Sequence, residues 1–139
     1  MNTPSPIKMA CIIDDDDLYI NLVKKIIDLK KLSENLLIFK NGKEALDYFT
    51  RISKNIEEVI YPEIILLDLN MPVMDGWGFL RNFAQIEPLK SIPTSLYIVS
   101  SSVDPVEIER AKSDTLVTDY LIKPLNLKEF EVLFSQKSA

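Results

Sequence analysis

The stretch ILLDLNMPVMDG, from Ile65 to Gly76, carries the strongest structural signal in the chain. Together with Ile64 it opens with four consecutive apolar residues, a run typical of a central strand in a parallel sheet, which is buried on both faces. Asp68 ends this run, and Pro72 and Asp75 then mark a loop. A segment of helical period follows, so this part of the sequence predicts a strand, a loop and a helix.

The same alternation recurs on both sides of this stretch. Each apolar run is short and is followed by a segment in which apolar residues repeat with helical spacing. Besides Ile64–Leu67, the predicted strands are Met9–Ile13, Leu36–Phe39, Leu96–Val99 and Tyr120–Ile122. Five strand–helix units in succession predict a doubly wound α/β fold, with a parallel sheet covered by helices on both faces.

The helical segments show recognisable starts. An acceptor residue followed three positions later by glutamate predicts helix N-termini at Asn41, Asp104 and Asn126, and Pro105 fits the first helical position. In the first helix we expect Asp17 to be the N-cap. Its buried face is predicted from the spacing of apolar residues and comprises Leu18, Leu22, Ile26 and Leu29. The polar stretch Ser53–Tyr61 receives no assignment.

The composition fits one compact domain. A chain of 139 residues with 47% hydrophobic residues can bury a sizeable core without disulfides or structural metals. We therefore expect a single domain over residues 1–139, with a core from about 8 to 134 and no output domain after it. The lone Cys11 and the lack of a signal peptide or a membrane-spanning apolar run favour a cytoplasmic protein.

Charge and residue usage exclude several functions. The net charge is −5, from 16 basic and 21 acidic residues, and no dense basic patch is visible, so neither nucleic-acid nor membrane binding is expected. The chain contains no histidine. This excludes Ser-His-Asp and Cys-His catalysis, zinc bound through histidine, and a role as a phosphohistidine carrier.

The residues that follow the predicted strands could form one site, because ligands of open parallel sheets bind beyond the carboxyl ends of the strands. Three carboxylates ionised at close range need a cation between them, and oxygen ligands suit Mg²⁺. A carboxylate can also attack phosphorus to give an acyl phosphate, which a metal and a lysine would assist. The residues concerned are Asp14, Asp15, Asp68, Ser100 and Lys123.

Four motifs in this order resemble those of CheY-like receiver domains of two-component response regulators. They are IIDDDDL (Ile12–Leu18), ILLDLNMPVMDG (Ile65–Gly76), IVSS (Ile98–Ser101) and YLIKP (Tyr120–Pro124). The resemblance extends from Lys8 to Phe134. It implies a flavodoxin-like fold with strand order 2-1-3-4-5, in a stand-alone receiver domain.

The resemblance also implies a role for each matching residue. Asp68 would be the phosphoacceptor, and Mg²⁺ would be bound by Asp14, Asp15, Asp68 and the backbone carbonyl of Asn70. Lys123 and Ser100 would contact the phosphoryl group, Ser100 and Tyr120 would form a switch, and Asn70 and Ser102 would tune dephosphorylation. Three features depart from the family pattern: Ser100 replaces the commoner threonine, no glycine occurs between Leu116 and Asp119, and the connection before Tyr61 is longer.

The implied partners follow from this family. A sensor histidine kinase or a phosphotransfer protein would donate the phosphoryl group. The domain would catalyse its own phosphorylation and dephosphorylation and would not act as an enzyme on a separate substrate. A downstream protein would bind the face formed by the fourth helix, the fifth strand and the fifth helix, and the chain would be a monomer or a phosphorylation-dependent dimer.

Alternatives remain at this stage. The run Asp14–Asp17 could be a solvated acidic segment, and Asp68 could merely end a strand. A haloacid-dehalogenase-like phosphatase also uses an aspartyl phosphate, but Leu18 is the wrong residue in its nucleophile motif and its later acidic motif is missing. A receiver-like interaction module that is never phosphorylated usually lacks an acidic ligand or the lysine, and this chain retains them.

Overall fold

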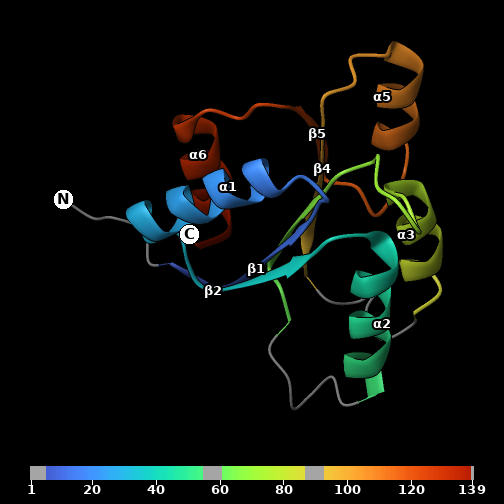
Figure 1. Ribbon diagram of the computed structural model, residues 1–139, viewed down its shortest axis with the longest axis horizontal. Helices are drawn as coiled ribbons and strands as arrows, with labels where there is room; N and C mark the ends of the chain where they lie inside the picture. The colour runs from blue at the N-terminus through green and yellow to red at the C-terminus, as the bar shows by residue number, and fades with distance from the viewer. Residues whose placement is uncertain (1–5, 55–60, 87–92, 139) are drawn as a thin grey trace.

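The computed structural model describes residues 6–54, 61–86 and 93–138. Most of the polar stretch between Ser53 and Tyr61 therefore lies outside the described residues. Within them, strands and helices alternate along the chain (Figure 1). The strands are β1 (Ile7–Ile13), β2 (Ser33–Phe39), β3 (Ile64–Leu67), β4 (Ser95–Ser100) and β5 (Asp119–Ile122). The helices are α1 (Asp17–Lys30), α2 (Gly42–Ile52), α3 (Gly76–Phe83), α5 (Pro105–Lys112) and α6 (Leu127–Ser138).

The strands form one parallel sheet in the order β2-β1-β3-β4-β5. This confirms the expected flavodoxin-like topology. Helices α1 and α6 cover one face of the sheet, and α2, α3 and α5 cover the other (Figure 1). None of the helices in the described part of the chain has the length and apolar character that a membrane span requires.

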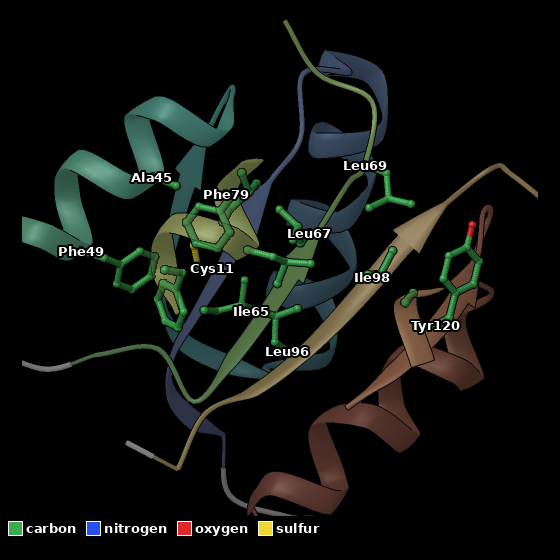
Figure 2. Packing of buried hydrophobic residues seen from close by; sticks show 14 of the residues in the cluster. Cys11, Ala45, Phe49, Ile65, Leu67, Leu69, Phe79, Leu96, Ile98 and Tyr120 are labelled. Atoms are coloured by element: carbon green, nitrogen blue, oxygen red, sulfur yellow. The ribbon is translucent and has the colours of Figure 1, made fainter. Parts of the chain in front are cut away.

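Alternate residues of the central strands build two hydrophobic clusters, because successive side chains of a strand point to opposite faces. In β3, Ile65 and Leu67 pack towards α2 and α3 (Figure 2), whereas Ile64 and Leu66 pack towards α1 and α6. All four are almost fully buried, which explains why the strand reads as an unbroken apolar run. The rings of Phe49, Phe79 and Phe83 lie 5.2–6.1 Å apart and join α2 to α3.

The predicted buried face of α1 is wrong. Leu18, Leu22 and Leu29 are 84%, 47% and 76% exposed, while Ile26 is half-buried. The buried stripe instead comprises Tyr19, Ile20, Val23 and Ile27. Both stripes have helical spacing, so periodicity alone could not distinguish them. The exposed stripe leaves apolar side chains in water, where single exposed leucines are common.

The N-cap of α1 also differs from the prediction. Asp16, and not Asp17 as predicted, is the cap, because its carboxylate accepts hydrogen bonds from the backbone N–H groups of Leu18 and Tyr19. Asp17 lies in the first turn and forms an ion pair with Lys40. The other expected helix starts are confirmed. The side chains of Asn41, Asp104 and Asn126 each accept a backbone N–H at the start of their helices.

The segment between Leu116 and Asp119 turns without glycine. Its turn is built around Asp114, whose carboxylate accepts the Leu116 N–H at 2.9 Å and whose carbonyl accepts the Val117 N–H at 3.0 Å. Among the described non-glycine residues, left-handed φ values occur only at Lys31 and Val73. The chain therefore turns without a glycine here, and β5 still pairs with β4 in the sheet.

Candidate functional site

Two neighbouring strands deliver three carboxylates to one edge of the sheet. Ile13 of β1 pairs with Leu67 of β3, so Asp14 and Asp68 leave the sheet next to each other. A ligand oxygen from each of Asp14, Asp15 and Asp68 lies within 4.8 Å of the other two. Asp14 is 1% exposed and Asp68 7%, whereas Asp15 is open to solvent. The structure therefore brings together the three acids selected from the sequence.

Lys123 reaches the same place from the end of β5. Its Nζ lies 2.7 Å from Asp14 Oδ2 and 3.8 Å from Asp68 Oδ1, and 15% of its side chain is exposed. The other oxygen of Asp14 accepts the backbone N–H of Asp16 at 2.9 Å. Each oxygen of Asp14 thus has one partner and can still accept another, whereas the Lys123 ammonium lies beyond hydrogen-bond distance of Asp68.

The pKa of Asp68 shows that burial and the Asp14 charge together outweigh the attraction to Lys123. Burial first and the Asp14 charge second raise the pKa of Asp68 to about 6, although Lys123 and the backbone N–H groups of Asn70 and Leu69 lower it. Two close carboxylates with one ammonium leave negative charge unbalanced. Oxygen donors in this arrangement, one of them open to solvent, fit a hydrated divalent cation such as Mg²⁺. The site thus has the composition of a magnesium site.

The proposed switch residues come from two neighbouring strands, Ser100 from the end of β4 and Tyr120 from β5. Ser100 is fully buried, and its hydroxyl accepts the Ser102 backbone N–H at 3.2 Å. Tyr120 is also buried and already turned inward in this structure. Its hydroxyl donates to the Ser102 carbonyl at 2.8 Å, and its ring borders the cluster drawn in Figure 2. Ser102 therefore links the two side chains. Asn70 is exposed just beyond Asp68.

One residue of the site was missed in the sequence. Tyr19, in the first turn of α1, places its ring under the Lys123 ammonium, with 4.3 Å between Nζ and the ring centroid. No motif pointed to this contact, since it joins segments far apart in the sequence. Its position five residues after Asp14, in the first turn of the following helix, was the available signal.

Gly76 fixes the loop that follows Asp68. Its backbone N–H donates to the Leu69 carbonyl at 3.0 Å. A Cβ atom at this position would lie 2.5 Å from the Asp68 carbonyl oxygen and 2.9 Å from the Leu69 Cα, both of which are backbone atoms. The start of α3 can approach the end of β3 this closely only because residue 76 has no side chain.

We expect Gly76→Ala to lower the free energy of unfolding by about 1–3 kcal/mol, because the backbone must move to admit the methyl group. Gly78→Ala is the matched control. There the nearest atom is the Met74 Cγ at 2.9 Å, part of a flexible side chain, and alanine favours the helix interior. Urea denaturation of both variants measures the difference. Equal losses at the two positions would contradict the close approach inferred at Gly76.

A doubly wound sheet with acids after its first and third strands and a lysine after its fifth defines a receiver-type domain. The family model of the response regulator receiver domain matches residues 10–134, and the chain belongs to this family. Members of this family accept phosphoryl groups from histidine kinases and bind Mg²⁺ at an acidic cluster.

Individual relatives resemble the chain over nearly its whole length. It is 30% identical over 125 residues to response regulator Rcp1 of Synechocystis, covering 90% of this chain and 82% of that protein. A two-component response regulator from Cytophaga hutchinsonii superposes with a TM-score of 0.80 at 28% identity, covering 95% and 97% of the two chains. The Mn²⁺-bound form of Rcp1 superposes with a TM-score of 0.71 at 26% identity, covering 93% and 90%.

Proposed function

We propose that this chain is a phosphorylation-controlled switch in which Asp68 accepts a phosphoryl group in a Mg²⁺-dependent reaction. The donor is a sensor histidine kinase or a phosphotransfer protein. The observation that supports this proposal best is the meeting of Asp14, Asp15, Asp68 and Lys123 at one edge of the sheet. No feature of the fold itself requires three acids there.

The chemistry follows from the positions of these side chains. A carboxylate oxygen of Asp68 attacks the phosphorus atom and forms a new O–P bond. The bond from phosphorus to the donor nitrogen breaks, and its electron pair stays on the imidazole. Because the pKa of Asp68 is about 6, most of the nucleophile is already ionised at pH 7, and no general base is needed. Lys123, 3.8 Å away, stabilises the transferred negative charge.

The carboxylates of Asp14, Asp15 and Asp68 and the backbone carbonyl of Asn70 would hold the metal. Mg²⁺ bound there would neutralise phosphoryl oxygens during the transfer. We propose that Asn70, two residues after Asp68, and Ser102, two residues after Ser100, set how easily water reaches the acyl phosphate. In this way the domain would catalyse both its own phosphorylation and its own dephosphorylation.

The signal would leave the site through Ser100 and Tyr120. When the Ser100 hydroxyl turns to donate to the phosphoryl group, it gives up the Ser102 N–H that it now accepts. Ser102 also holds the Tyr120 hydroxyl, so the two events are mechanically linked. The face that would respond consists of α5, β5 and α6 and exposes Val106, Ile122 and Val132. We propose that a downstream protein binds this face, or that a second copy does so after phosphorylation.

The direct test is chemical labelling. We expect acetyl phosphate with Mg²⁺ to phosphorylate the wild type on Asp68, and Asp68→Asn to remove the label completely, because an amide is not a nucleophile for phosphorus. Borohydride trapping of the acyl phosphate followed by peptide mass spectrometry identifies the residue.

Asp16→Asn provides the matched control. Asp16 belongs to the same acidic run, but its carboxylate caps α1, and asparagine caps equally well. This variant should be labelled like the wild type. Phosphate found on a residue other than Asp68, or undiminished labelling of Asp68→Asn, would refute the proposed function.

A further inference from the structure

The Lys123 ammonium is surrounded by three groups, of which only two are carboxylates. Its Nζ lies 2.7 Å from Asp14 Oδ2, 3.8 Å from Asp68 Oδ1 and 4.3 Å from the centroid of the Tyr19 ring. An ammonium within about 6 Å of a ring face is attracted by the negative charge of that face. Within the described part of the chain, Tyr19 supplies the ring under this lysine.

The Tyr19 ring is held rigidly in place. It lies in the first turn of α1, where the Asp16 carboxylate accepts the Tyr19 backbone N–H at 3.2 Å. The side chain is 9% exposed and packs in the cluster between the sheet and the helices α1 and α6. The Lys123 ammonium, by contrast, is carried at the end of a flexible side chain of four carbon atoms. The ring is therefore the fixed partner and the ammonium the movable one.

The Tyr19 hydroxyl shows that hydrogen bonding does not explain this residue. Among the described residues, its oxygen is the buried side-chain polar atom that has no hydrogen-bond partner. Burial first, and then the charges of Asp14 and Asp68, raise the pKa of the Tyr19 phenol, so the group stays neutral. A buried hydroxyl without a partner is unfavourable. The contribution of Tyr19 to the site must therefore come from its ring.

We propose that Tyr19 is a positioning residue for Lys123, whose ring face holds the ammonium between Asp14 and Asp68. The inference rests on the proposed function, because it names a residue that supports the phosphoryl-contacting lysine. Without the ring, the short contact to Asp14 would draw Lys123 away from Asp68. Attraction to a ring face has little directional preference compared with a hydrogen bond. The ammonium can therefore turn towards a phosphoryl group on Asp68 without leaving the ring.

The test compares variants of two tyrosines. Tyr19→Leu removes the ring, and Tyr19→Met does so with a flexible side chain that fills the space if leucine impairs folding. Tyr97→Leu is the matched control, because Tyr97 is 6% exposed and packs in the same cluster from β4. We expect the Tyr19 variants to lower the rate of phosphorylation by acetyl phosphate about tenfold. Tyr97→Leu should change it by less than about twofold, and Tyr19→Phe should restore most of the rate.

A double-mutant cycle separates positioning from a structural role. In a Lys123→Met background, Tyr19→Leu should cause no further loss of rate, because the lysine through which it acts is gone. A full additional tenfold loss, or equal losses from Tyr19→Leu and Tyr97→Leu, would overturn the proposal.

The contact also has a readout that does not depend on phosphorylation. The ε-methylene protons of Lys123 should show an upfield ring-current shift by NMR, which Tyr19→Leu removes and Tyr97→Leu keeps. Absence of that shift in the wild type would refute the role of Tyr19 by itself. If the wild type were not phosphorylated on Asp68, the proposed function would fail, and the ring-current shift would still decide whether Tyr19 positions Lys123.

Discussion

In metal-free buffer at pH 7, the Asp68→Asn variant will be more stable than the wild type by roughly 2–3 kcal/mol. Burial and the neighbouring Asp14 carboxylate raise the pKa of Asp68 from an ordinary 3.8 to about 6. The folded protein therefore binds a proton more tightly than the unfolded chain does. Ionising Asp68 therefore costs more free energy in the folded protein than in the unfolded chain. The asparagine side chain of the variant does not ionise, so the variant does not carry this cost.

The sign of the pH dependence follows from the same comparison. Between about pH 4 and pH 6 the folded state holds more protons than the unfolded state, so the stability of the wild type falls as the pH rises through this window. The stability difference between Asp68→Asn and the wild type should therefore be small at pH 4 and reach its full size above pH 6. Urea denaturation across this range, with a chelator present, measures that difference.

A surface acid provides the control for this experiment. Asp47 pairs with Lys43 at 2.7 Å on the exposed side of α2, and Asp47→Asn should change stability by less than about 1 kcal/mol at every pH. If Asp68→Asn were no more stable than the wild type at pH 7, attraction to Lys123 would outweigh the combined effect of burial and repulsion from Asp14. The charge balance that indicates a cation site would then be wrong.

The parallel sheet and the clustering of the acidic residues at its edge could be predicted from the sequence for one reason. Parallel strands all end at the same edge of the sheet, so the residues that follow β1, β3 and β5 lie along that edge, and the order of the strands decides how close they come. Asp14, Asp68 and Lys123 were therefore expected at one edge of the sheet from the sequence alone. The order of the strands was not determined by periodicity and came from the family resemblance.

What the sequence could not predict depends on packing between distant elements. Helix α1 has two apolar stripes, and packing against the sheet and α6 decides which of them is buried, so Leu22 was wrongly predicted as buried. The contact of Tyr19 with Lys123 joins the first and last strand–helix units, and no local pattern marks it. The turn around Asp114 replaced an expected glycine because a side-chain carboxylate can satisfy the same backbone N–H groups.

Mg²⁺ will raise the thermal stability of the wild type, and Asp15→Asn will remove most of that increase. The ion should bind the folded cluster of Asp14, Asp15 and Asp68 more tightly than the unfolded chain, in which Asp68 is no longer held beside the other two acids. At a concentration one hundred times the dissociation constant, such binding adds about 2.7 kcal/mol. For a domain of this size that corresponds to a rise in Tm of about 8 °C.

Asp15 is the informative position because it is exposed and contributes little to the core. Replacing it should leave the metal-free protein about as stable as the wild type, so that a lost Mg²⁺ shift reflects lost binding. Asp16→Asn, adjacent in the sequence but engaged in capping α1, should keep the full shift.

Differential scanning calorimetry is carried out with Mg²⁺ and, separately, with NaCl at the same ionic strength. The comparison separates binding at the site from general screening by salt, which weakens interactions between exposed charges most. An equal shift with NaCl, or an undiminished Mg²⁺ shift in Asp15→Asn, would place the ion elsewhere. Bound Mg²⁺ should also reduce the stability advantage of Asp68→Asn at pH 7, because the cation supplies the positive charge that the two buried acids lack. The metal effect and the pH effect are therefore two measurements of the same unbalanced charge.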